Sequence, residues 1–128
     1  MSLLLGGAVI GKAAAPPISP MSLSGSLSAT NSGGTVTSAT RTVTVPAGNS
    51  GIFTFANYAD NGVVTTTQYS RNGGAFTTIT DGADTVAFSN GDTIAVRTNS
   101  VGVGESRAFN VIDKTSGTTI EAVSHIYA

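Results

Sequence analysis

The chain has one histidine, His125, which is the natural candidate for a catalytic base. In a hydrolytic triad it would take a proton from a serine nucleophile while an acid orients its ring. Serines are abundant, but none stands in the Gly-x-Ser-x-Gly sequence that places a nucleophile on a sharp strand-to-helix turn. His125 shares a predicted strand face with Val123 and Tyr127. We therefore expect a half-buried or exposed strand histidine and no catalytic residue.

Carboxylates are the second group that could do chemistry. Asp81, Asp84 and Asp92 are close enough in sequence to suggest the acid and base of a glycosidase, and with Asp60 they could supply oxygen ligands to calcium. However, Asp81 and Asp92 stand beside glycines in good turn sequences, where an aspartate hydrogen-bonds its own backbone. The spacing of an EF-hand is also missing. We therefore expect no metal ion, no cofactor and no enzymatic activity.

Exposed aromatic rings are the usual platforms for sugars. The chain offers Tyr58, Tyr69 and Tyr127 and has no tryptophan. Tyrosines of a small β domain more often lie in the core or at its rim, with the hydroxyl bonded. A glycan-binding role therefore stays open, and its signature would be an exposed tyrosine or aspartate cluster on the loop tips.

Composition narrows the classes of partner. Six basic and seven acidic residues give a net charge of −1, and the basic residues are scattered along the chain. Without a basic run to neutralise phosphates, we expect no nucleic-acid partner. The absence of cysteine removes disulfides and thiolate chemistry. Only 10% of the residues are charged, which suits either a surface packed against neighbours or an ordinary threonine-rich β domain.

Most of the chain from Met21 onward alternates apolar and polar residues. This period of two is typical of strands with one buried face, and no stretch has a convincing helical period. The segments 63–70 and 118–127 are strand-like through their β-branched residues, but their inward face is ambiguous. The residues that we expect in the core are Phe53, Phe55, Val86, Phe88, Ile94, Val96, Phe109 and Val111.

Turn sequences separate these runs. Asn72-Gly73 and Asn90-Gly91 predict tight type I′ turns between antiparallel strands, because both central residues of that turn need positive φ. Seven to nine short strands at this spacing predict a sandwich or a small barrel.

The first 20 residues have a different character and are predicted to form an extended N-terminal arm, with the β domain spanning residues 21–128. Pro16, Pro17 and Pro20 hold the connection extended. The apolar run is too short for a membrane span, and no basic residue precedes it as in a signal peptide. The arm residues that we expect to make assembly contacts are Leu3, Leu4, Leu5, Val9 and Ile10.

Residues 66–98, TTQYSRNGGAFTTITDGADTVAFSNGDTIAVRT, resemble the immunoglobulin-like modules found in tailed-phage virion proteins and in bacterial surface proteins. Those modules often carry a Tyr-Ser-x-Asn-Gly-Gly hairpin, then an Asn-Gly-Asp turn, then a strand that ends in Val-Arg. The matching residues here are Tyr69, Ser70, Asn72, Gly73, Gly74, Asn90, Gly91, Asp92, Val96 and Arg97. The resemblance implies an all-β, immunoglobulin-like antiparallel β-sandwich with an extended N-terminal arm.

A single small module with an apolar arm further resembles the head decoration and tail accessory proteins of tailed phages. The function implied is a non-enzymatic structural component of a tailed-phage or phage-like particle, either a capsid decoration or a fibre-type accessory protein. Its partners would be the major capsid or tail protein, it would form a homo-oligomer, and it would lie on the virion surface. The alternatives are a host-surface or glycan-binding adhesin module and an accessory domain of a secreted hydrolase.

Overall fold

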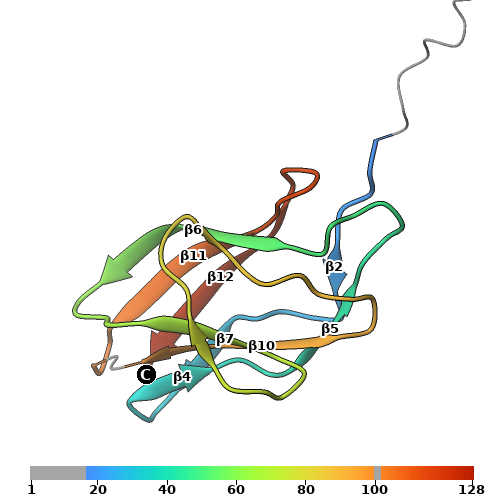
Figure 1. Ribbon diagram of the computed structural model, residues 1–128. Helices are drawn as coiled ribbons and strands as arrows, with labels where there is room; N and C mark the ends of the chain where they lie inside the picture. The colour runs from blue at the N-terminus through green and yellow to red at the C-terminus, as the bar shows by residue number, and fades with distance from the viewer. Residues whose placement is uncertain (1–16, 100–101) are drawn as a thin grey trace, which may run out of the picture.

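The chain folds into two β-sheets packed face to face (Figure 1). The computed structural model describes residues 17–99 and 102–128, and within them it contains strands and no helix. The prediction of an all-β sandwich is thereby confirmed. Its immunoglobulin-like character stays a prediction.

The first sheet has the order β2-β5-β10-β7-β8, and β4 also pairs with β10. The pairs are antiparallel, and β2 forms one edge of this sheet. Its strands are β2 (Ser22–Leu23), β4 (Thr35–Thr37), β5 (Arg41–Thr44), β7 (Thr67–Arg71), β8 (Thr77–Thr78) and β10 (Thr93–Asn99).

The second sheet has the order β3-β12-β11-β6-β9. Its strands are β3 (Ala29–Asn31), β6 (Phe53–Asn61), β9 (Ala83–Asp84), β11 (Ser106–Asp113) and β12 (Thr119–Tyr127). One pair departs from the antiparallel arrangement that we predicted, because β3 runs parallel to the end of β12. The chain crosses from β2 in the first sheet to β3 in the second. There β3 pairs with β12, which is the last strand of the chain.

The core lies between the sheets and is built from the inward positions of the alternating strands. The Phe55 and Phe109 rings are 5.5 Å apart between centroids, and Phe53 and Phe88 make an edge contact at 5.4 Å. Aromatic pairs of this geometry add to the gain from burial. Seven of the eight predicted core residues are buried, namely Phe53, Phe55, Phe88, Ile94, Val96, Phe109 and Val111.

The prediction that the eighth residue, Val86, lies in the core is wrong, because this residue is 54% exposed. The segment 85–89 is not a regular strand, so its side chains do not alternate. Instead Thr85 is buried, and its Oγ1 accepts a hydrogen bond of 3.1 Å from the amide of Phe53. The Val86 amide donates to the hydroxyl of Tyr69 at 2.9 Å. A hydroxyl thus takes the inward place that the pattern assigned to valine.

The two asparagine-glycine sequences form different turns. Asn72 and Gly73 both have positive φ, 55° and 71°, and the turn joins β7 to β8 with a bond of 3.0 Å from the Gly74 amide to the Arg71 carbonyl. This is the geometry of a type I′ hairpin turn. At Asn90-Gly91 only the glycine has positive φ, which fits a type II turn.

The Asn90-Gly91 turn does not close a hairpin, and the prediction that it lies between paired strands is wrong. β9 pairs with β6 and β10 with β7, so the strands on either side of the turn belong to different sheets. The turn packs on β5 instead, where the Gly91 amide donates to the Val43 carbonyl and Asn90 Oδ1 accepts from the Val45 amide, both at 2.9 Å.

Candidate functional site

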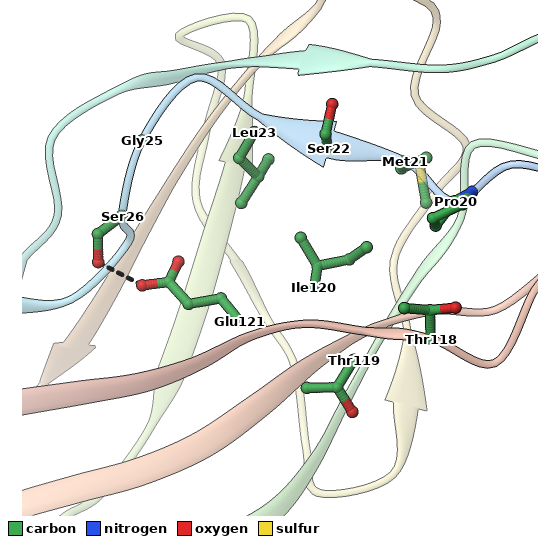
Figure 2. A pocket seen from close by; sticks show the side chains of 10 residues that line it. All are labelled: Pro20, Met21, Ser22, Leu23, Gly25, Ser26, Thr118, Thr119, Ile120 and Glu121. Carbon is green, nitrogen blue, oxygen red and sulfur yellow. Dashed lines mark hydrogen bonds between the residues drawn. The ribbon is translucent and has the colours of Figure 1, made fainter.

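An open groove of about 490 Å³ lies on one flank of the sandwich, between β2 of the first sheet and the start of β12 in the second. Figure 2 shows Leu23 and Ile120 pointing into the space between these strands, whereas Ser22 points away from it. Met21, at the head of β2, is buried and adds to the apolar wall. The groove is lined by Pro20, Met21, Ser22, Leu23, Gly25, Ser26, Thr118, Thr119, Ile120 and Glu121.

Both strands that border the groove have an unpaired edge in the described part of the chain. β2 pairs only with β5, through Ser22 and Leu23. β12 pairs with β3 only at residues 125–127, so residues 119–122 have a strand neighbour on one side alone. Unpaired edges carry free backbone donors and acceptors and can accept a further strand.

Glu121 closes one end of the groove, where the chain crosses between the sheets. Its Oε1 accepts a hydrogen bond of 2.8 Å from the Leu27 amide, and its Oε2 accepts one from the Ser26 hydroxyl (Figure 2). A carboxylate that accepts a hydrogen bond from a backbone amide holds that part of the loop in place. The crossing is thereby fixed against β12.

Asp113 organises the other end, near the point where the N-terminal segment joins β2. This side chain is fully buried, and its Oδ2 accepts from the Met21 amide at 3.2 Å, from Asn49 Nδ2 at 2.8 Å and from the Ser116 hydroxyl at 2.7 Å. Its Oδ1 accepts from the Thr115 amide at 3.2 Å. One carboxylate therefore joins the start of β2, the loop before β6 and the turn between β11 and β12.

His125 is fully buried, so our expectation of a half-buried or exposed histidine is wrong. Its Nε2 lies 2.8 Å from the Leu27 carbonyl oxygen, which can only accept, so Nε2 carries the proton. Its Nδ1 lies 2.8 Å from Thr98 Oγ1 and accepts from that hydroxyl. Both nitrogens are therefore occupied in the folded protein.

The histidine begins a polar chain that crosses the core to the surface. Thr98 is 3.3 Å from Thr67, and Thr67 Oγ1 accepts from Arg107 Nη1 at 3.1 Å. The Arg107 guanidinium then makes two bonds to the Asp60 carboxylate, 2.7 Å from Nε and 2.9 Å from Nη2. These hydrogen bonds link the inner faces of both sheets. A chain in which each buried group has a partner specifies one arrangement of the sheets.

The buried environment of His125 predicts a loss of stability in mild acid. Burial lowers the pKa of the ring, while the bond to Leu27 and the charge of Glu121 oppose that shift in part. Below pH 6.5 the unfolded chain binds a proton that the folded chain resists, so the stabilisation is complete above that pH and falls as the pH drops. We expect the free energy of unfolding to decrease by up to about 2 kcal/mol between pH 7 and pH 5.

Urea denaturation at several pH values tests this expectation, and the chain offers a clean control. His125 is the only histidine, so His125→Gln should remove the slope between pH 7 and pH 5. Hydrogen bonds lower the pKa of Asp60, Asp84 and Asp92. The stabilisation that these carboxylates contribute is therefore lost at a more acidic pH than that of His125. An equal slope in the variant and the parent would contradict the assignment.

A second, smaller groove of about 230 Å³ lies beside the polar chain. It is lined by residues that include Tyr58, Asp81 and Arg107, together with threonines of the segments 65–67 and 78–80. Arg107 lies over the Tyr58 ring at 4.7 Å, and the Tyr58 hydroxyl donates to the Ile79 carbonyl at 2.7 Å. Burial raises the pKa of this hydroxyl. Of the sequence-predicted sugar-binding candidates, Tyr58 lines this groove, whereas Tyr69 is buried, Tyr127 is half-buried, and both are outside the lining of these two grooves.

The structure gives three of the four candidate acids partners of their own. Asp60 pairs with Arg107, Asp84 pairs with Lys114 and accepts from Thr54, and Asp92 caps the turn at the Ser89 amide. Side-chain hydrogen bonds from their partners lower the pKa of Asp60 and Asp84, and the bond from the Ser89 amide lowers that of Asp92. Among residues 17–99 and 102–128, no three His, Asp or Glu side chains gather as metal ligands would.

The predicted arm residues Leu3, Leu4, Leu5, Val9 and Ile10 lie outside the described residues. Residues 17–20 are described and exposed, and they lead away from both sheets beside β2 (Figure 1). In the described part of the chain no helix has the length and apolar character needed to cross a membrane.

Sequence reasoning missed Asp113 and Glu121, which hold the two ends of the larger groove. The sequence Asp-Lys-Thr-Ser-Gly at residues 113–117 carries a local turn signal for Asp113. Glu121 has no such signal, because its partners are more than 90 residues away.

Comparison with protein-family profiles, with curated proteins and with solved structures finds no match to the chain.

Proposed function

We propose that this protein is a non-enzymatic structural component of a tailed-phage or phage-like particle. It acts as a capsid decoration or fibre-type accessory protein on the virion surface, and its N-terminal arm attaches it to the assembly. Its partners are the major capsid or tail protein, and several copies associate. The proposal has its origin in the resemblance of residues 66–98 to immunoglobulin-like modules of virion proteins.

The observation that carries the proposal is the way the N-terminal segment leaves the sandwich. Residues 17–20 are exposed and extend away from the sheets, and the segment before them holds six apolar side chains without a charge at residues 3–10. An apolar segment of this kind is normally covered in a stable protein. Each apolar side chain that it buries contributes about 1.5–3 kcal/mol before ordering costs.

The residues that an enzymatic role would need support the same proposal. His125 is buried with both nitrogens bonded, so it is not free to take a proton from a substrate. Asp60 and Asp84 are held in ion pairs. The contacts of these three residues stabilise the fold, and a structural role requires no catalytic chemistry from them.

Deleting residues 2–15 tests the anchor directly. We expect the truncated chain to keep its melting temperature within a few degrees, because the hydrophobic core that the structure describes is built from residues 21–123. We also expect it to lose co-sedimentation with particles that lack the native protein, because multivalent attachment fails once each contact is gone. The control is Val63→Ala, which alters an exposed residue elsewhere and should bind as the parent does.

Two results would oppose the proposal. A truncated chain that still binds particles at full occupancy would show that the anchor lies on the sandwich. A truncated chain that does not fold would show that the segment belongs to the domain.

A second candidate function, binding of a host-surface glycan, is favoured by the smaller groove. There a half-buried tyrosine, the exposed carboxylate of Asp81 and several threonine hydroxyls lie together, which are groups that bind sugars. If this is the function, Asp81→Ala should weaken binding to host cells by about tenfold or more, the equivalent of one lost charged hydrogen bond. Asp84→Ala, outside the groove, should leave it unchanged, and equal binding by both variants would remove the candidate.

A further inference from the structure

We propose that the groove between β2 and β12 receives residues 3–10 from a second copy of this chain, added as a short strand along the free edge of β2. The arm of one copy then links it to the sandwich of the next. This inference goes beyond the proposed function, because it concerns the purified chain and needs no particle.

The edge of β2 supplies the backbone part of the site. β2 forms one limit of its sheet, and on the side away from β5 it has no strand neighbour in the described residues. An extended peptide binds to such an edge through main-chain hydrogen bonds, while its alternate side chains enter the space below. The groove provides that space beside the same edge.

The side chains of groove and arm match in chemistry. The floor of the groove is apolar, with Met21, Leu23 and Ile120 facing its interior (Figure 2). Residues 3–10 carry two short apolar blocks, Leu3 to Leu5 and Ala8 to Ile10, separated by Gly6-Gly7 and without a charge. β2 has only two paired residues, so a block of three residues suits the length of its edge. Burial of such side chains drives association.

The position of the prolines favours a second copy over the chain's own arm. Pro20 itself lines the groove, and residues 17–20 lead away from the two sheets beside β2 (Figure 1). To enter its own groove, the arm would have to reverse and return alongside residues 16–20. Three of those five residues are prolines without an amide hydrogen, so such a ladder loses most of its donors on one side.

The arm also has the necessary reach. In a polyproline II conformation, residues 6–17 would cover about 37 Å at about 3.1 Å per residue. A domain of about 100 residues has a radius of gyration of about 13 Å. The apolar blocks can therefore reach past the edge of their own sandwich to a neighbour.

Paired cysteines test the proposal, because the natural chain has none. In one full-length variant, Leu4→Cys is combined with Ile120→Cys, and in a second Val9→Cys is combined with Ile120→Cys. After mild oxidation, we expect denaturing, non-reducing electrophoresis to show a ladder of covalently linked chains for at least one pair. The control pairs Leu4→Cys with Val63→Cys, an exposed position outside the groove. Its cross-linking should be slower by about tenfold or more, because only docking raises the local concentration of the two thiols.

The position of the cross-link decides the result. A disulfide formed between the two cysteines of a single chain would overturn the proposal in favour of an arm that enters its own groove. Rates equal to that of the control pair for both variants would overturn it altogether. If Ile120→Cys lowers the melting temperature enough to unfold the domain, Thr118→Cys, an exposed position on the same groove, replaces it.

Failure here is distinguishable from failure of the proposed function. The cross-linking experiment contains no virion protein, whereas co-sedimentation measures attachment to the particle. Ile120→Asp with an intact arm completes the separation: it should abolish the ladder of a Leu4→Cys/Thr118→Cys chain, and its binding to particles is scored independently.

Discussion

Asp113→Ala is expected to lower the free energy of unfolding by about 4 kcal/mol. The carboxylate is fully buried and accepts four hydrogen bonds, two of them from backbone amides. Alanine leaves these donors without their acceptor, and each buried donor left unpaired costs about 1–3 kcal/mol. Water that enters the new space recovers part of that loss. Because the bonds join three segments distant in sequence, the loss should appear in one cooperative transition under urea.

Two other variants serve as comparisons for the result of Asp113→Ala. Asp113→Asn keeps an oxygen for the three donors on Oδ2 but sets an amide hydrogen against the Thr115 amide, so a smaller loss of about 1–2 kcal/mol is expected. Asp81→Ala removes an exposed acid and should stay within about 0.5 kcal/mol of the parent. If Asp113→Ala were as mild as Asp81→Ala, Asp113 would not hold the three segments together.

The parts of this fold that could be predicted are those decided by neighbouring residues. Phe53 and Phe55 are both buried because a regular strand places residues two apart on one face. Asn72-Gly73 forms its hairpin turn because both residues tolerate positive φ. In each case a few neighbouring residues determine the local structure, and the rest of the fold is compatible with it.

Predictions failed where a distant partner decides the local structure. Val86 has the right neighbours for an inward position, but Thr85 turns inward to accept the Phe53 amide and breaks the alternation. His125 was expected nearer the surface, because nothing close to it in sequence indicates Thr98 or the Leu27 carbonyl as partners. A buried polar residue is stable only with its partners, and sequence spacing alone does not identify them.

The candidate groove could not be predicted for the same reason. Its two walls, β2 and the start of β12, lie almost 100 residues apart and belong to different sheets. The arm, in contrast, was visible as an apolar segment beside prolines. Sequence reasoning therefore identified a segment that needs covering, and the structure adds a surface of matching chemistry.

Gly51→Ala is expected to destabilise the domain by about 2–5 kcal/mol, the sum of two separate costs. Gly51 has a φ of 77°, and an L-residue with a side chain pays about 1–2 kcal/mol there. A Cβ at this position would also lie 2.1 Å from the carbonyl oxygen of Phe88, which is backbone and cannot rotate away. The Phe88 amide donates to the Gly51 carbonyl at 2.8 Å, so relief of the clash strains that bond and displaces a core phenylalanine. Overpacking of this kind costs about 1–3 kcal/mol or more.

Gly48 separates the two contributions to the Gly51 effect, because it lies in the same loop with nearly the same backbone. Its φ is 82°, but a Cβ there would meet no atom within 4 Å. Gly48→Ala should therefore cost only the conformational part, about 1–2 kcal/mol. Urea denaturation of both variants then gives the cost of the close approach between residues 51 and 88 by difference. Equal losses would mean that the two backbones are farther apart than the structure has them, and the loop before β6 would not be anchored on the segment that carries Phe88.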